Sequence, residues 1–276
     1  MSPRTNLRRL LNAGRRLVQQ DTPRASTADE LRRELERFGK WVYPFELADG
    51  VVTPLQFDWL AEAHETRFRM MLPEIDALFD GRWNEVSCLD AGCNEGYVGF
   101  EIARRGAKAV VGFDARPQNI EKAEFVKRQL QVKNISFDVA NIDSLTPERY
   151  GAFDLTLFLG LLYHLEDPIG ALRRLRAVTR ELCVIDTQVL RDGPSVTTIA
   201  GMEEVETNDI LAVLEEPEWD ESPLAAMTGS ALVPNKSALF TMLRHAGFRN
   251  VRQAMPYPGC YDRYANFDRV IVFASV

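Results

Sequence analysis

Strands and helices alternate along this chain from residue 86 onward, and no other feature of the sequence limits the fold as strongly. Short apolar stretches are separated by amphipathic stretches, which is the pattern of a mostly parallel sheet covered by helices. The last two strands have no helix predicted between them, so they should form an antiparallel hairpin. The expected strands lie near residues 86–90, 109–114, 135–140, 153–159, 181–187, 248–255 and 267–274. The expected helices lie near residues 96–105, 117–130, 168–178 and 236–246.

The residues before this alternation read as a helical N-terminal extension. A basic amphipathic helix is expected over residues 1–20, followed by a linker. A second helix should run from about 28 to 38, because Thr27 and Glu30 have the spacing of a capping box. A third is expected from about 55 to 72. We therefore divide the chain into an extension or cap, residues 1–75, and an α/β domain, residues 76–276.

An acidic insertion, residues 188–235, interrupts the alternation after the fifth strand. Residues 191–222 hold ten acidic side chains and one basic side chain, Arg191. An insertion of this length in a compact domain is usually a functional cover or a mobile segment. We expect a lid, and the alternative is an acidic face that is simply solvated.

Charge and composition exclude several classes of protein. The net charge is −7, yet residues 1–40 carry ten Lys and Arg against five acids. That basic arm is either a contact for RNA, an anionic surface or a second copy, or a solvated terminal helix. No run approaches 18 apolar residues and no apolar segment follows the N-terminal arginines, so we expect a soluble cytoplasmic protein without membrane contact. The four cysteines are irregularly spaced, which predicts reduced thiols and no metal site.

One loop carries the signal of a nucleoside-binding site. The strand Val86–Asp90 runs into Ala91-Gly92-Cys93-Asn94-Glu95-Gly96, whose glycines allow a tight turn and a close approach to a ligand. Eighteen residues after Gly96, the next strand ends on Asp114, which can accept both ribose hydroxyls of an adenosine. The loop is neither GxGxxG nor a P-loop, and Asp90 would repel a phosphate. The Asp90 carboxylate suits the ammonium group of a methionine moiety instead.

These residues resemble a known family. Asp90-x-Gly92-x-x-x-Gly96, Asp114 and Phe153-Asp154-Leu155 are similar to motifs of class I S-adenosylmethionine (SAM)-dependent methyltransferases, over about residues 84–190. The resemblance implies SAM as cofactor and a Rossmann-like seven-stranded α/β sheet, mostly parallel with an antiparallel C-terminal hairpin. It implies cofactor contacts from Asp90, Gly92, Cys93, Asn94, Gly96, Asp114, Ala115, Asn141, Ile142, Leu159 and Gly160.

A narrower resemblance concerns the end of the fourth strand. Gly160-Leu161-Leu162-Tyr163-His164 followed by Asp167-Pro168 is similar to the tRNA wobble-uridine methyltransferase and carboxymethyltransferase group. Members of that group place a Tyr-His pair here, and the carboxymethylating ones hold an extra carboxylate of the cofactor with basic and aromatic residues. The matching Trp-Arg-Lys cluster is missing, since this chain reads Tyr43-Pro44-Phe45-Glu46. Plain SAM is therefore expected.

Candidate catalytic residues are few, because methyl transfer needs positioning and at most one proton acceptor. They are His164, Tyr163 and His64, each with an alternative role in packing or loop structure. The expected function is methyl transfer to a small hydroxyl- or amine-bearing molecule, such as a sugar or secondary metabolite. The alternatives are a tRNA wobble-uridine methyl or carboxymethyl transferase, with tRNA as partner, and a non-catalytic SAM-binding scaffold. A homodimer is also compatible with the sequence.

Overall fold

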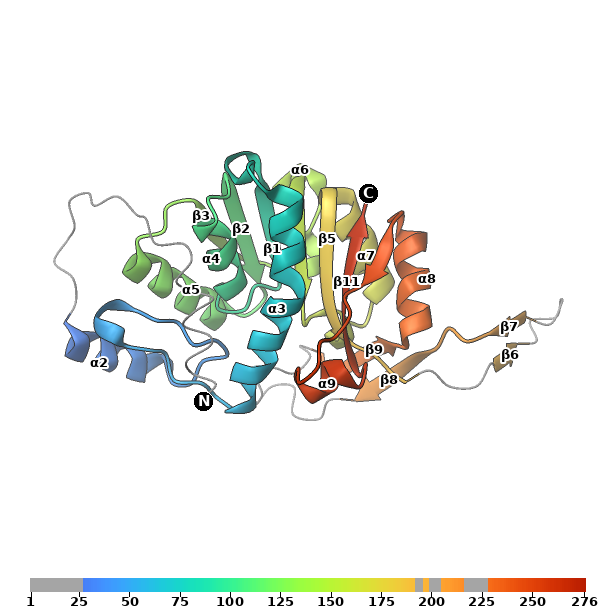
Figure 1. Ribbon diagram of the computed structural model, residues 1–276, viewed down its shortest axis with the longest axis horizontal. Coiled ribbons are helices and arrows are strands. Elements are labelled where there is room, and N and C mark those ends of the chain that lie inside the picture. Colours follow the sequence, from blue (N-terminus) through green and yellow to red (C-terminus); the bar gives the residue numbers. More distant parts are fainter. Residues whose placement is uncertain (1–26, 192–195, 199–204, 216–227) are drawn as a thin grey trace. The chain divides into compact units, whose positions relative to one another are not determined.

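A computed structural model describes residues 27–191, 196–198, 205–215 and 228–276 of the chain (Figure 1). The helix expected over residues 1–20 and nearly all of the linker after it lie outside the described residues. The chain divides into two compact units, Met1–Asn141 and Ile142–Val276, and each is described by itself. The predicted division after residue 75 follows sequence pattern rather than compactness, and it stays a prediction.

Seven strands form one sheet in the order β10-β11-β5-β4-β1-β2-β3. Pairing is parallel between β1 and β2, β2 and β3, and β4 and β5, whereas β11 is antiparallel to both β5 and β10. The expected α/β sheet, mostly parallel with an antiparallel C-terminal hairpin, is therefore confirmed. The strands are β1 Ser87–Ala91, β2 Ala109–Asp114, β3 Ile135–Val139, β4 Phe153–Leu159, β5 Thr179–Gln188, β10 Val251–Gln253 and β11 Arg269–Ser275.

The first unit builds its core on β1, β2 and β3. Leu89 of β1, Phe113 of β2 and Phe100 of α4 are all buried in it. Helix α2 begins where the capping box predicts, because Thr27 and Glu30 bind each other's backbone N–H groups. The helices are α2 Ala28–Phe38, α3 Trp59–Phe79, α4 Tyr97–Arg104 and α5 Pro117–Leu130, with 3₁₀ turns η2 Ala48–Gly50 and η3 Trp83–Glu85.

Helix α3 differs from its expected range of 55–72. It begins at Trp59 and continues through Pro73 to Phe79. Proline removes one backbone hydrogen bond from a helix interior, but Ile75 and Phe79 beyond it are both fully buried. Burial of these side chains contributes about 1.5–3 kcal/mol each, which offsets the cost of the proline.

The second unit contains β4, β5, β10, β11 and the helices between them. The insertion contains two antiparallel hairpins, and the buried Asn235 joins one of them to α8 by accepting hydrogen bonds from Ile210 N and Ala238 N. The short helix α9 Asp262–Ala265 lies between the last two strands, where none was expected. The remaining elements are η4 Ile142–Ser144, α6 Pro147–Tyr150, η5 Leu162–His164, α7 Pro168–Val178, β6 Val196–Thr198, β7 Val205–Thr207, β8 Leu211–Glu215, β9 Ser230–Pro234 and α8 Lys236–Ala246.

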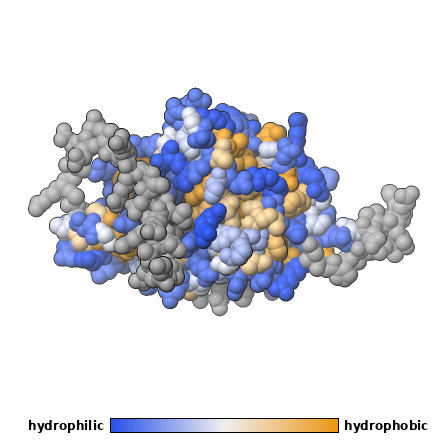
Figure 2. All heavy atoms as spheres, viewed as in Figure 1, coloured by the Kyte–Doolittle hydropathy of each residue, from blue (hydrophilic) through white to orange (hydrophobic). Residues whose placement is uncertain are grey.

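Hydrophobic and hydrophilic residues are both exposed on the face drawn in Figure 2. Within the described ranges, no helix is both long enough and apolar enough to cross a membrane.

Candidate functional site

The loop between β1 and α4 has the geometry that its glycines predict. Gly92 and Gly96 both have positive φ angles, 73° and 79°. The backbone N–H groups of Gly92 and Cys93 both donate to Phe113 O, each at 2.9 Å. The loop is thereby fixed to the carboxyl end of β2, the strand that ends on Asp114.

Gly96 is required for space as well as for backbone conformation. A Cβ atom added there would lie 2.6 Å from two ring carbons of Phe137, closer than van der Waals contact allows. Gly112 is constrained by the same ring, at 2.8 Å. The backbone of the loop therefore passes directly over the aromatic side chain of β3.

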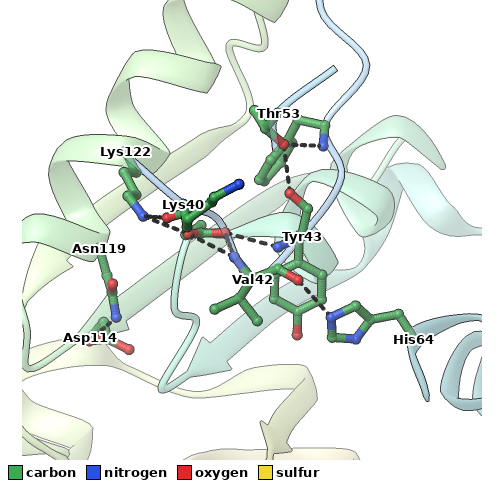
Figure 3. Close-up of polar contacts among 10 residues, drawn as sticks. Lys40, Val42, Tyr43, Thr53, His64, Asp114, Asn119 and Lys122 are labelled. Atoms are coloured by element: carbon green, nitrogen blue, oxygen red, sulfur yellow. Dashed lines mark hydrogen bonds and ion pairs between the residues drawn. The ribbon is translucent and has the colours of Figure 1, made fainter. Parts of the chain in front are cut away.

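Asp114 fixes the loop from the other side. Its Oδ2 accepts a hydrogen bond from Asn94 N at 3.0 Å, and its Oδ1 accepts one from Arg116 N at 2.9 Å. The same Oδ1 accepts from Asn119 Nδ2 at 3.0 Å (Figure 3). Burial raises the pKa of Asp114, and these three hydrogen bonds lower it. A carboxylate has about four acceptor positions, so a ribose has to share the carboxylate with the loop.

Asp90 is buried at the end of β1, with an exposed fraction of 2%. Its Oδ2 accepts from Gly99 N at 3.0 Å, in the first turn of α4. Burial raises the pKa of Asp90 to about 7, the charge of Asp114 raises it as well, and the charge of Arg67 lowers it. A second acidic group thus lies close to the loop, as a site for an ammonium group requires.

The other predicted cofactor residues of the first unit lie in or beside the same loop. Cys93 is buried, and burial raises the pKa of its thiol well above the usual range, which suits packing rather than nucleophilic attack. Asn94 has a left-handed backbone, with φ 52°. Ala115 is half-buried after β2, and Asn141 is exposed after β3.

His64 lies in an aromatic stack rather than in solvent. It is 3% exposed, its Nε2 lies 2.9 Å from Val42 O, and its ring stacks on Tyr43 at 4.1 Å. Tyr43 also stacks on Tyr97, and its hydroxyl accepts a hydrogen bond from Arg67 Nη1 at 3.0 Å. The predicted catalytic role of His64 stays a prediction, while its contacts are those of a residue that holds Tyr43.

Sequence reasoning assigned no role to Glu95 or Lys122. Glu95 stands inside the quoted loop but was read only as a spacer between glycines. Its carboxylate, 1% exposed, accepts hydrogen bonds from Val42 N and Tyr43 N, and pairs with Lys122 Nζ at 3.0 Å (Figure 3). A buried carboxylate must be paired, but no local pattern indicates which distant residues pair with it.

The second unit holds the remaining predicted residues. Leu159 is buried at the end of β4, Gly160 follows with a φ of 80°, and Gly160 N donates to Asp186 O at 2.7 Å. Tyr163 and His164 are half-buried in η5, with ring centroids 4.0 Å apart. The predicted adenine contact Ile142 is buried at the start of η4. The predicted Tyr-His pair is therefore a pair in space.

A buried ion pair stands beside Tyr163. Arg269 Nη2 lies 2.8 Å from Asp186 Oδ2, Arg269 Nε lies 2.9 Å from Asp186 Oδ1, and Tyr264 donates to the same carboxylate. Arg269 Nη1 reaches the Tyr163 hydroxyl at 3.4 Å. Two nitrogens of the guanidinium, Nε and Nη2, thus bind the Asp186 carboxylate, and the third, Nη1, binds Tyr163.

Comparison with known families and sequences gives three findings. The family described as a methyltransferase domain matches residues 84–219. A tRNA U34 carboxymethyltransferase of Saccharophagus degradans is 28% identical over 217 residues, which are 68% of this chain and 59% of that protein. A tRNA U34 carboxymethyltransferase of Aliarcobacter butzleri is 36% identical over 87 residues, 31% of this chain and 28% of that protein. The chain therefore spans less than two thirds of these curated relatives.

Solved structures share the fold at low sequence identity. The N-terminal domain of EvdMO1 with S-adenosylhomocysteine (SAH) bound has a TM-score of 0.70 and 20% identity, covering 93% of this chain and 100% of that one. Magnesium protoporphyrin IX methyltransferase of Synechocystis with bound SAM has a TM-score of 0.53 and 16% identity, covering 92% and 99%. At these identities the likeness concerns the fold.

Proposed function

We propose that this chain, whose residues 84–219 match the family described as a methyltransferase domain, transfers the methyl group of SAM to a hydroxyl or amine of a small molecule, such as a sugar or secondary metabolite. The observation that carries the proposal is the junction of Asn94 and Asp114, which joins the glycine loop to the second strand through one 3.0 Å hydrogen bond. This junction places a carboxylate for a ribose beside a backbone that a cofactor can approach.

The two ends of the cofactor call for different residues. Asp114 would bind the ribose, and Asp90 would face the ammonium of the methionine moiety, with Gly92 and Gly96 leaving room for the chain between them. Asn141, Ile142, Leu159 and Gly160 would border the adenosine. Arg67, whose charge lowers the pKa of Asp90, adds a cation for the methionine carboxylate. A carboxylate and a guanidinium together are the complement of an amino-acid zwitterion.

Methyl transfer itself requires only that the protein position the reactants and, for a hydroxyl acceptor, remove one proton. The acceptor oxygen or nitrogen forms a bond to the methyl carbon, the bond from that carbon to sulfur breaks, and SAH leaves. A hydroxyl acceptor also loses its proton, and His164, with Tyr163 beside it, is the proposed proton acceptor. A sugar acceptor is supported by the N-terminal domain of EvdMO1, whose structure was determined in the presence of SAH and D-fucose. That structure is similar to this chain with a TM-score of 0.69.

The runner-up is modification of a tRNA wobble uridine, which the names of the curated relatives favour. A carboxymethyl cofactor would need a free cation for its extra carboxylate. Arg269 is placed beside Tyr163, but Asp186 already occupies two of its nitrogens. An added carboxylate would face that negative charge, so plain SAM fits better.

The test is calorimetric titration of the purified protein with SAM and SAH, beside Asp114→Ala. Loss of hydrogen bonds to a charged group costs about 1.5–3 kcal/mol, so we expect binding in the unchanged protein and affinity at least tenfold weaker in the variant. Asp154→Ala is the matched control, because Asp154 pairs with Arg180 at the amino end of β4. It should bind SAH as the unchanged protein does.

Acceptor screening then separates the three functions. Transfer of labelled methyl groups to sugars supports the proposal, and transfer to tRNA supports the runner-up. SAM binding without transfer to any acceptor would indicate a scaffold. If neither SAM nor SAH binds, the proposal is wrong.

A further inference from the structure

Glu95 is a buried charge that the proposed chemistry does not use. Its side chain is 1% exposed, and its two oxygens accept hydrogen bonds from Val42 N at 3.1 and 3.0 Å and from Tyr43 N at 3.1 Å. Both donors are main-chain groups 53 and 52 positions earlier in the chain. The cofactor loop therefore holds a piece of the N-terminal extension through one carboxylate.

Lys122 of α5 completes the arrangement. Its Nζ lies 3.0 Å from Glu95 Oε1 and donates to Lys40 O at 2.6 Å. The same ammonium lies 4.8 Å from the centre of the Trp41 ring, close enough for a cation–π contact. We call Glu95 and Lys122 the latch and residues 40–43 the latched segment. Figure 3 shows Lys122 beside Lys40, Val42 and Tyr43 of that segment.

The latched segment positions Tyr43 next to Tyr97, the residue that follows the cofactor loop. Tyr43 packs between His64 and Tyr97, and its hydroxyl accepts from Arg67 Nη1. The other end of His64 is set by Val42 O, which belongs to the segment as well. Arg67 in turn acts on the charge of Asp90. A chain of contacts thus runs from Glu95 through the segment to Arg67, the cation proposed for the methionine carboxylate.

We infer that Glu95 is a positioning residue for cofactor binding, acting through residues 40–43 rather than by touching the cofactor. This inference rests on the proposed function. The ionised carboxylate accepts two main-chain N–H groups and an ammonium at once, which a neutral amide cannot do. With the latch open, Tyr43 no longer orients Arg67, and the loop next to Gly96 loses its outer support. Both effects weaken binding of the methionine moiety.

The experiment compares Glu95→Gln with the matched control Glu101→Gln. Glu101 is also buried and paired, with Arg104 and Arg105, but it has no contact with the latched segment among the described interactions. Hydrogen bonds to a charged group are worth a factor of about 10–100 in a binding constant. We expect SAH affinity to fall about 10-fold or more in Glu95→Gln and to stay within about 2-fold in Glu101→Gln.

The rate of tryptic cleavage after Lys40 measures whether the latch holds the segment, and it does not require methyl transfer. Lys40 is exposed, but Trp41 beside it is fully buried, so the bond between them is protected while the segment is held. Mass spectrometry should show faster cleavage there in Glu95→Gln than in Glu101→Gln, and slower cleavage of the unchanged protein when SAH is bound. Because Glu101→Gln also removes a buried paired carboxylate, faster cleavage in Glu95→Gln alone separates the latch from a general loss of stability.

Variants at Lys122 provide a second route if Glu95→Gln does not fold. Lys122→Arg keeps the cation and should retain SAH affinity, whereas Lys122→Met should reproduce the loss. Equal SAH affinity in the unchanged protein and in folded Glu95→Gln would overturn the inference and leave the proposed function standing. An equal loss in Glu101→Gln would also overturn it. Failure of the unchanged protein to bind SAM or SAH would instead overturn the proposed function, and the inference with it.

Discussion

Asp90 has a pKa of about 7 because it is buried at the end of β1, with the charge of Asp114 adding to the effect and Arg67 opposing it. Below pH 7 the group is mostly protonated, and above pH 7 it is mostly ionised. An ammonium group binds the ionised form, so ligand binding below pH 7 must release a proton.

We therefore expect SAH to bind more weakly at pH 5.5 than at pH 7.5, by up to about 10-fold for each pH unit below the pKa. Calorimetry in two buffers with different ionisation enthalpies measures the proton release directly. Asp90→Asn cannot ionise and should flatten the pH dependence as well as lowering the affinity. Unchanged affinity and no proton release at pH 5.5 would show that Asp90 does not face the ammonium.

Individual site residues differ in how far the sequence predicts them. Gly92, Gly96 and Asp114 follow from spacing, because a loop after one strand and an acid after the next must meet at one edge of a parallel sheet. Glu95 and Lys122 do not, since their partners in residues 40–43 are set by tertiary packing. The pairing of Arg67 with Tyr43 is likewise a contact between an irregular segment and a helix. Neither the helical nor the strand period of hydrophobic residues predicts such a contact.

At the scale of elements, the turn from β1 into α4 depends on Gly96 in two ways. Its φ of 79° favours glycine, and a Cβ would lie 2.6 Å from the Phe137 ring. Gly81 has a φ of 72° and no atom within 4 Å of its Cβ position, so it isolates the conformational part of the cost.

We expect Gly96→Ala to lower the free energy of unfolding by about 1–3 kcal/mol more than Gly81→Ala does, and to weaken SAH binding as well. Adding Phe137→Leu should recover part of the affinity by removing the clash while leaving the backbone strain. Denaturant unfolding and calorimetry measure the two effects. Equal destabilisation by the two alanines would mean that the ring of Phe137 moves aside at little cost.

Elements with a local stop or start signal were predicted well. The capping box predicted the start of α2, and the observed bounds of α5 and α7, which both begin with proline, match the expected ones. The expected range of α3 ends at residue 72, one residue before Pro73, whereas the helix continues to Phe79 with Ile75 and Phe79 buried. Four-residue α9 has no periodicity long enough to detect. The presence of short helices and the bounds of helices that cross a proline depend on tertiary packing. A local sequence pattern carries no information about that packing.

The net charge of the whole molecule bears on the choice between the two proposed acceptors, a small molecule and tRNA. The net charge is −7, and a tRNA ligand requires a basic surface that follows phosphates. Residues 1–40 carry ten of the 33 Lys and Arg, so the basic arm is where such an electrostatic contact would reside. The rival acceptors therefore differ in a property of the whole chain, the dependence of binding on salt.

We expect labelled tRNA to bind no more tightly than non-specific complexes do at physiological salt, with a dissociation constant of about 1 μM or weaker. Deleting residues 1–25 should leave SAH affinity and methyl transfer to a small acceptor unchanged, because Asp90, Asp114 and the latch all lie outside that range. Fluorescence anisotropy over a salt series measures tRNA binding, and calorimetry measures SAH binding. Tight tRNA binding that falls steeply with salt and is lost on deletion would replace the sugar acceptor by tRNA, and would give the six arginines of residues 1–25 a direct role in recognition.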